Sequence, residues 1–238
     1  MPARKPKQLD FGLRRMSRHG GYRPGAGRKK TSKLQSHVAR PRFKASEPLH
    51  IALKLRDGLP SLRRDDVYRE LRRAILETRG LAINHFAILS NHIHLILEAP
   101  GQRSLARQMQ ALAIRLAKAL NRIERREGPV FRERYHCHVL RTPAEVRNAL
   151  AYVLLNERRH RSYGRVRLGL HSSAVLVSDR HWKALIGPRW RRLAGVPLGR
   201  DPDESKEIER DVATLVKTPR SWLLRTGWLR TVPSSALL

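Results

Sequence analysis

The stretch "SNHIHLILEAP", residues 90–100, places two histidines one residue apart in an otherwise apolar run. Side chains alternate between the two faces of a strand, so the even-numbered residues from His92 to Glu98 would share one face. The odd-numbered residues 93–97 are all Ile or Leu and would share the other, which is typical of a sheet core. The first face brings two imidazoles and a carboxylate together. It indicates either a metal site or the solvent-facing side of a sheet.

The segments around this strand predict an alternation of strands and helices. Apolar alternation predicts strands, and an apolar stripe of helical period predicts helices. The short turn around Ser90-Asn91 predicts an antiparallel hairpin. The order β-α-β-β-α-β-α predicts an α+β fold, a ferredoxin-like antiparallel sheet with helices packed on one face and His92 and His94 on the open face. The predicted strands are 48–56, 81–88, 92–98 and 130–140, and the predicted helices are 64–80, 104–128 and 142–160.

The helix predicted over 142–160 has the strongest start signal in the chain. Thr142 is an N-cap residue, Pro143 suits the first helical position, and Glu145 completes a capping box. Tyr152 and Asn156 are four residues apart, so they would stack on one side of this helix. Set beside His92 and His94, they would offer a phenol nucleophile and a metal site of two imidazoles and a carboxamide oxygen.

The composition narrows the class of partner. The chain has 238 residues, with 50 Lys and Arg against 20 Asp and Glu, a formal net charge of +30. Such a charge predicts a polyanion as partner, usually nucleic acid. The single cysteine, Cys137, excludes an intrachain disulfide and a cysteine-based zinc cluster. The start "MPARKPKQLD" has no apolar segment of a secretory signal, and no stretch reaches the roughly 18 apolar residues of a membrane span. We therefore expect a cytoplasmic protein.

Charge and composition also predict a division of the chain into three segments. Residues 1–47 are predicted to be a basic disordered arm, 48–165 the folded domain, and 166–238 a small C-terminal helical extension. Residues 1–44 contain 14 Lys and Arg against one acid. Such a block is either a solvated tail or an arm that lies in a DNA groove. The candidate DNA contacts are Arg23, Arg28, Lys29 and Lys30 in the arm and Arg107 and Arg115 on the helix predicted over 104–128.

The motif "SNHIHLILEAP", followed by an apolar helix and by "GPVFRERYHCHVLRTPAEVRNALAYVLLNERRH", resembles the HUH single-tyrosine transposases. It is especially similar to the transposases of bacterial insertion sequences and to REP-associated tyrosine transposases. The resemblance covers about residues 48–160. It implies that His92, His94 and Asn156 hold Mg²⁺ or Mn²⁺ against a phosphate of single-stranded or hairpin DNA. It also implies that Tyr152 cleaves and rejoins the strand through a 5′-phosphotyrosine. Such proteins are monomers or homodimers of the bacterial cytoplasm, nucleoid-associated when bound to DNA.

Several alternatives stand beside this interpretation. A His-x-His pair in a strand is, by itself, more often solvent-facing than metal-binding. Tyr135 is the next candidate nucleophile, ahead of Tyr68. His160 and Glu98 are possible additional ligands of the metal. His136 and His138 form a second same-face pair, which is either a metal site, a phosphate contact or plain sheet surface. The alternative function is a catalytically inactive, domesticated DNA- or RNA-binding protein.

Overall fold

The structure is a computed structural model. It describes residues 40–156, 167–168, 170–187, 196–197 and 202–231. The arm candidates Arg23, Arg28, Lys29 and Lys30, together with His160, lie outside the described residues. Within the described ranges, no helix combines the length and the apolar character needed to cross a bilayer.

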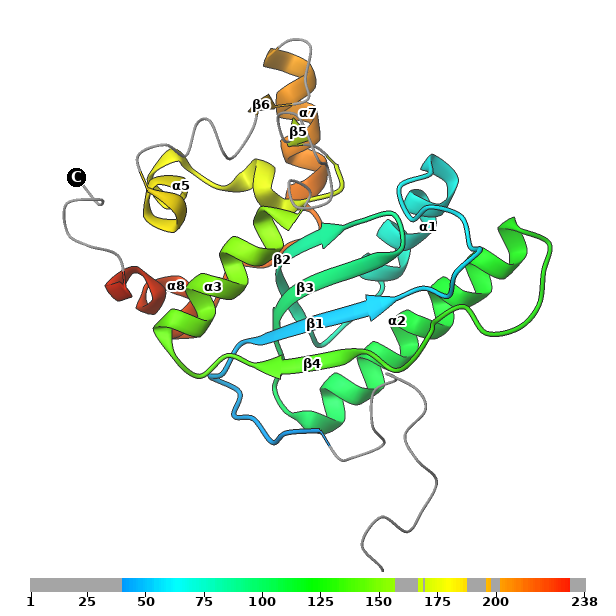
Figure 1. The fold of residues 1–238 in the computed structure, drawn as a ribbon, viewed down its shortest axis with the longest axis horizontal. Helices are drawn as coiled ribbons and strands as arrows, with labels where there is room; N and C mark the ends of the chain where they lie inside the picture. The colour runs from blue at the N-terminus through cyan, green and yellow to red at the C-terminus, as the bar shows by residue number, and fades with distance from the viewer. Residues whose placement is uncertain (1–39, 157–166, 169, 188–195, 198–201, 232–238) are drawn as a thin grey trace, which may run out of the picture. The chain divides into compact units, whose positions relative to one another are not determined.

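Four antiparallel strands form the central sheet, in the order β2-β3-β1-β4 (Figure 1). They are β1 (Leu49–Lys54), β2 (Ala82–Ile88), β3 (His92–Glu98) and β4 (His136–Val139). The helices α1 (Asp65–Leu76) and α2 (Gln102–Ile123) make the connections from β1 to β2 and from β3 to β4. The α+β class and the antiparallel sheet are therefore confirmed. A short parallel pair, β5 (Arg167–Leu168) and β6 (Val196–Pro197), lies outside this sheet.

The hairpin that presents the two histidines is held at its turn by three backbone hydrogen bonds. The Leu89 amide donates to the carbonyl of His92 at 2.9 Å, which closes the turn at Ser90-Asn91 as predicted. Two amides from the segment after β1 reach the same turn: Leu55 donates to the Asn91 carbonyl and Leu62 to the Ser90 carbonyl, each at 2.8 Å. The turn before β3 is therefore held both by the end of β2 and by the segment that follows β1.

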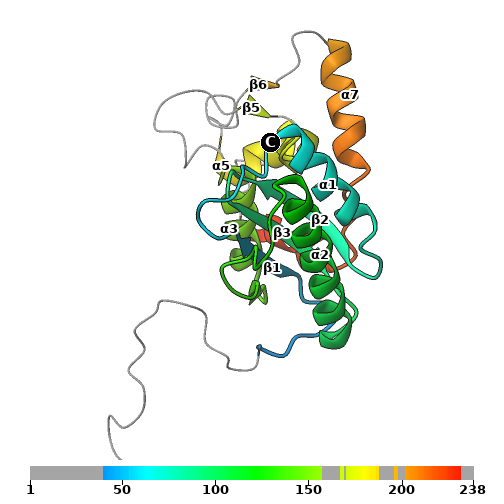
Figure 2. The ribbon, with the colours of Figure 1, turned by 90° about the vertical axis from the view of Figure 1, so that its right-hand side faces the viewer.

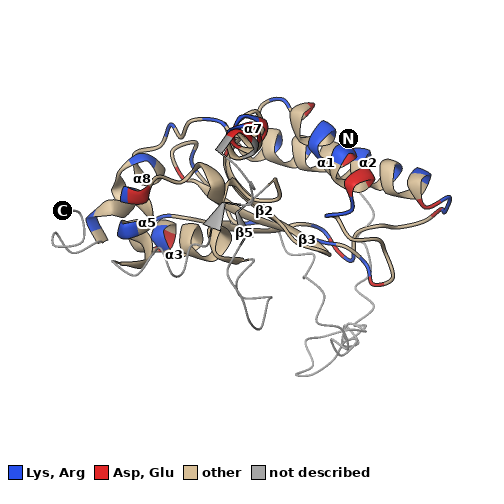
Figure 3. Cartoon of the chain, turned by 90° about the horizontal axis from the view of Figure 1, so that it is seen from above, with Lys and Arg blue, Asp and Glu red and all other residues tan. Residues whose placement is uncertain are grey.

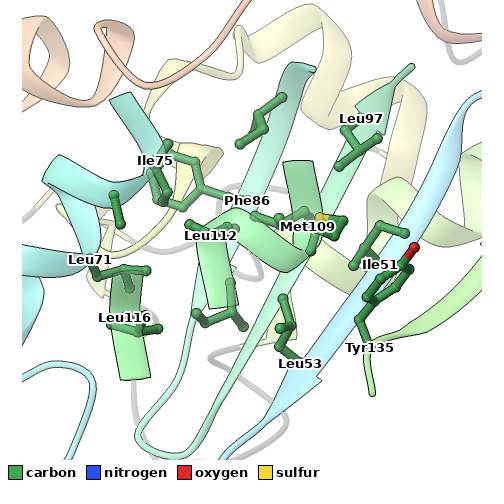
Figure 4. Close-up of a cluster of buried hydrophobic side chains, with 14 of the residues drawn as sticks. Ile51, Leu53, Leu71, Ile75, Phe86, Leu97, Met109, Leu112, Leu116 and Tyr135 are labelled. Atoms are coloured by element: carbon green, nitrogen blue, oxygen red, sulfur yellow. The ribbon is translucent and has the colours of Figure 1, made fainter. Parts of the chain in front are cut away.

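The first face of the sheet is covered by α1 and α2. Their apolar stripes pack on the inward residues of the strands, and the resulting core is fully buried. A bulge at Asn84 keeps both halves of β2 facing this core, because it shifts the register between Ile83 and His85. Figure 4 shows this cluster, to which the strands contribute Ile51, Leu53, Phe86 and Leu97, α1 contributes Leu71 and Ile75, and α2 contributes Met109, Leu112 and Leu116.

The second face is not open, so the prediction of helices on one face is incomplete. Helix α3 (Pro143–Leu154) packs on β2 and β3, on the side of the sheet opposite α2 (Figures 1 and 2). A second buried cluster forms there around Ile96, Val153, Trp182 and Trp228. It also draws on α5 (Asp179–Ile186), α8 (Trp222–Arg225) and the 3₁₀ turns η1 (Ser173–Leu176) and η2 (Gly227–Thr231).

The C-terminal segment is thus part of the domain's core. The Lys217 amide donates to the Ile83 carbonyl at 2.7 Å, and Glu98 accepts from the amides of Arg220 and Ser221 at 2.8 and 2.7 Å. Between η1 and η2 lies α7 (Pro202–Ala213), which packs near η1. At the start of the described residues, the guanidinium of Arg40 lies 3.7 Å from the ring centroid of Tyr135.

The predicted cap of α3 is confirmed, whereas the predicted continuous helix is interrupted at Leu155; its predicted end at residue 160 lies outside the described residues. Thr142 accepts from the Glu145 amide, and the Glu145 carboxylate accepts from the Thr142 amide, which is the reciprocal capping box. The helix ends at Leu154, with Leu155 as C-cap. Asn156 therefore lies just beyond α3 instead of one turn along a continuous helix from Tyr152.

Candidate functional site

Three elements bring a phenol and three imidazoles together on the second face of the sheet. The Tyr152 ring of α3 stands edge-on to the His94 ring of β3, with 5.2 Å between centroids. His92 lies 4.9 Å from His94 by the same measure. His50 of β1 completes the group at 5.3 Å from His94 and 5.7 Å from Tyr152. We call these four residues the histidine–tyrosine cluster. The structure thus brings together Tyr152, His92 and His94, as expected.

His50 is a residue of this cluster that was not predicted from the sequence. The alternation of the strand does indicate which face His50 occupies, because Leu49, Ile51 and Leu53 point into the core and leave His50 on the other face. Alternation does not reveal which strands are neighbours, however. In the structure β1 lies directly beside β3, with Ala52 opposite His94, so that His50 lies next to the predicted histidine face.

Burial and neighbouring charge keep His50 uncharged. Desolvation by burial, together with smaller electrostatic contributions from His136 and His138 on the adjacent strand β4, lowers the pKa of His50 to about 4. His138 lies opposite His50 in the register, and His136 lies opposite Ala52. At neutral pH the cluster therefore offers a neutral imidazole in contact with His94.

Each of the two predicted metal ligands has its Nδ1 atom in a hydrogen bond. The Nδ1 atom of His92 lies 2.7 Å from Oδ1 of Asn91, the residue before it. The Nδ1 atom of His94 lies 3.2 Å from Nε2 of His50. His94 is also deeply placed, with 5% of its surface exposed. The expectation that it stands on an open face is therefore wrong, because α3 covers it.

The predicted ligands are two imidazoles and one amide, which are donor types that a divalent cation can accept. Within the described ranges, no three His, Cys, Asp or Glu side chains are arranged to hold a metal ion. In a metal site built on His92 and His94, a third protein donor would then be of another type. Asn156 is fully buried, and neither atom of its amide has a hydrogen-bond partner among the described residues. A buried amide without a partner costs free energy unless it meets a ligand or water, so Asn156 fits the predicted role.

The alternative nucleophiles lie in the other core. Tyr135 is buried on the α2 side of the sheet, beside Ile51 (Figure 4), and desolvation raises its pKa. Tyr68 donates its hydroxyl to the Leu170 carbonyl at 2.5 Å, and burial raises its pKa to about 12. Glu98 shares the strand face of His94, but both carboxylate oxygens accept backbone hydrogen bonds from the C-terminal segment.

A cleft opens beside the cluster. It has a volume of about 570 Å³, and its lining includes His50, Tyr152, His138 and Glu145. The Nε2 atom of His138 lies 3.9 Å from Oε1 of Glu145, the capping-box carboxylate at the start of α3. His136 and His138 are both exposed on β4. The second histidine pair therefore lies on the surface of the sheet, and His138 borders the cleft.

The basic residues of α2 lie away from this cleft. Arg107 and Arg115 belong to the helix that packs on the opposite face of the sheet, and Arg115 pairs with Glu77 at 3.1 Å. Figure 3 shows acidic residues among the basic ones on α1, whereas the sequence of α2 contains no Asp or Glu. A cation on the cluster's own face is Lys54, which is exposed and lies opposite His92 in the register.

Comparison with known proteins finds matches among solved structures. No family model matches the chain, and no curated protein is similar to it. A similar solved structure is that of the REP-associated tyrosine transposase bound to a REP hairpin, a family that the sequence motifs resemble. The match has a TM-score of 0.47 at 20% identity, and it covers 55% of this chain and 78% of that one.

Proposed function

We propose that the chain is a metal-dependent single-strand DNA transesterase, a transposase or a domesticated descendant of one, in which Tyr152 is the nucleophile. The observation that supports this most is the packing of the Tyr152 ring on the His94 ring, with 5.2 Å between their centroids and with His92 adjacent to His94. His92, His94 and Asn156 would hold Mg²⁺ or Mn²⁺. When bound, the ion supplies Lewis-acid polarisation of a phosphate oxygen and orients the phosphate.

The chemistry assigned to Tyr152 is an in-line displacement at phosphorus. Its phenolic oxygen forms a bond to phosphorus while the bond to the 3′ oxygen breaks, and the departing oxygen takes a proton to become a free 3′-OH. The 5′ end stays attached to Tyr152 as a phosphodiester, and the phenolic proton leaves to solvent. Attack by another 3′-OH reverses the step, so rejoining needs no ATP. A phenol has a reference pKa of about 10, so it depends on its surroundings for activation.

The proposed substrate is single-stranded or hairpin DNA. The net charge of +30 supports a polyanionic partner, and the sequence resemblance to REP-associated tyrosine transposases supports hairpin DNA in particular. The 570 Å³ cleft beside Tyr152 and His50 offers room for nucleotides that flank the attacked phosphate. Lys54 supplies a positive charge on the same face.

The test is capture of the covalent intermediate. Labelled single-stranded and hairpin oligonucleotides are incubated with the protein and Mn²⁺, and adducts that survive denaturing electrophoresis are digested and mapped by mass spectrometry. We expect the nucleotide on the peptide that contains Tyr152. The Tyr152→Phe variant should lose the adduct while its DNA affinity stays almost unchanged, because cationic side chains supply the affinity.

Tyr135→Phe is the matched control, since Tyr135 lies in the opposite core and should leave adduct formation intact. A full adduct yield from Tyr152→Phe would transfer the role of nucleophile to another tyrosine. Tight DNA or RNA binding with no adduct on any oligonucleotide, in Mn²⁺ or Mg²⁺, would instead favour the inactive, domesticated nucleic-acid-binding protein.

A further inference from the structure

We propose that Asn91 and His50 are positioning residues, which hold His92 and His94 in the tautomer that carries its proton on Nδ1. Both rings then present the lone pair of Nε2 to a divalent cation. The inference rests on the proposed function, because it takes His92 and His94 as metal ligands. It adds two residues to which neither the sequence motif nor the proposed reaction assigns a role.

The contact between Asn91 and His92 fixes one ring. The carboxamide oxygen of Asn91 only accepts hydrogen bonds, so at 2.7 Å the hydrogen must belong to Nδ1 of His92. A neutral imidazole carries one N–H, which places the lone pair of His92 on Nε2. The Asn91 backbone is itself held, since its carbonyl accepts from the Leu55 amide at 2.8 Å. The orienting group therefore sits on a fixed turn.

The contact between His50 and His94 allows two arrangements, and only one suits a ligand. A single hydrogen lies between Nε2 of His50 and Nδ1 of His94, which are 3.2 Å apart. If His50 donated it, the proton of His94 would sit on Nε2 and block that nitrogen. If His94 donates it, Nε2 of His94 carries the lone pair. Metal-bound histidines generally donate their second N–H to an acceptor in this way, so we assign the hydrogen to His94.

The placement of His50 suits an orienting role. It is partly buried, lies on the central strand β1, and its ring packs edge-on against Tyr152 at 5.7 Å between centroids. A side chain fixed by strand and helix at once can hold the His94 ring in one orientation. The two contacts are also equivalent in chemistry, because an acceptor meets Nδ1 in both rings. Together they prepare the histidine pair before any metal arrives.

The first experiment reads the tautomers directly. Protein labelled with ¹⁵N in histidine is studied by NMR, metal-free and above the pH range in which free imidazole titrates. Ring signals are assigned with His92→Gln and His94→Gln. We expect both residues as Nδ1–H tautomers in the wild-type protein. His50→Phe, which keeps a ring but loses the acceptor, should release His94 to the Nε2–H form. His50→Gln, which can return an acceptor at the position of Nε2, should preserve Nδ1–H.

The second experiment measures Mn²⁺ affinity without DNA, by following free Mn²⁺ with electron paramagnetic resonance. Loss of an outer-shell partner typically weakens metal binding by about 10- to 100-fold. We expect a loss of that order for His50→Phe and for Asn91→Ala, and rescue by His50→Gln. Thermal melting shows whether each variant is folded. A merely structural role for His50 would lower the melting temperature but leave the His94 tautomer unchanged.

The spectrum of the wild-type protein tests the two tautomers even if the His50→Phe variant does not fold. An Nε2–H tautomer for His94 or His92 in the metal-free protein would overturn the inference for that residue. An unchanged His94 tautomer in folded His50→Phe would overturn the role of His50. If the tautomers are as proposed but the wild-type protein does not bind Mn²⁺, the proposed function fails while the positioning contacts stand.

Discussion

At the scale of single residues, the imidazole and amide donors of the proposed site determine whether Mn²⁺ or Mg²⁺ is expected to bind more tightly. The proposed set holds two histidines and the Asn156 amide, and the nearby carboxylate of Glu98 is occupied by backbone amides. Mg²⁺ prefers oxygen ligands, whereas imidazole favours transition metals. Because imidazole donors suit first-row transition metals better than Mg²⁺, we expect Mn²⁺ to support adduct formation at lower concentrations than Mg²⁺. Metal titrations at constant ionic strength check this. Equal half-maximal concentrations for the two ions would argue that oxygen ligands dominate the site.

The burial of His94 decides how its role is tested. Alanine at a position with 5% exposure leaves a cavity and removes the hydrogen bond to His50, so lost activity would be ambiguous. Glutamine fills more of the space and keeps a polar end. Loss of metal-dependent cleavage in His94→Gln, with a cooperative melting transition retained, would separate the role as ligand from the role in packing.

At the scale of elements, α3 carries the nucleophile, and its start is stabilised by the capping box. Thr142→Ala removes the side-chain acceptor of the Glu145 amide, so we expect the free energy of unfolding to fall by about 1 kcal/mol. Thr142→Ser keeps the hydroxyl and should remain close to wild type. Urea unfolding of the two variants measures the difference. Equal losses for Ala and Ser would show that packing of the threonine methyl, and not the cap, stabilises this end.

The elements also show what local sequence pattern can predict. Strand alternation and the capping signal at Thr142 place every strand of the main sheet and the start of α3, because both signals act between near neighbours in sequence. They cannot reveal that β1 lies beside β3, which puts His50 against His94, because strand pairing is a long-range property. The break in the helix after Leu154 was missed for a similar reason. Helical spacing from Tyr152 to Asn156 does not show that Leu155 interrupts the helix.

At the scale of the whole molecule, the prediction of an extension over 166–238 missed that its described parts complete the second core. Trp182 and Trp228 pack there against Ile96 and α3. The pattern in this region is weak because its apolar residues come from short turns and helices. No single element shows a period, although together they bury the second face of the sheet.

Partly buried histidines make the molecule's stability depend on pH. Desolvation lowers the pKa values of His85 and His171 to about 4, from an unfolded value near 6.5. Between these values the unfolded chain binds more protons, so stability rises with pH and is lost as pH falls from about 6.5 to about 4. Each such histidine contributes up to about 1.4 kcal/mol per pH unit. Urea unfolding across this range should show the slope, and His85→Asn should reduce it. An unchanged slope in that variant would assign the effect to other groups.

The charge of the basic arm is expected to raise the affinity of the molecule for DNA. Residues 1–39 hold 11 Lys and Arg against one Asp, and a deletion that stops there spares Arg40, which stacks on Tyr135. Removing one cation that neutralises a phosphate should reduce the log–log salt slope of binding by about 0.7 for single strands and 0.9 for duplex. If Arg23, Arg28, Lys29 and Lys30 each bind a phosphate, replacing all four with Gln should lower the slope by about three units on single-stranded DNA. This full-length variant is the matched control for the deletion, since it removes charge without shortening the chain. Adduct formation at saturating DNA should persist in both. A salt slope equal to wild type on hairpin and single-stranded DNA, with the protein folded, would show that the arm is a solvated tail.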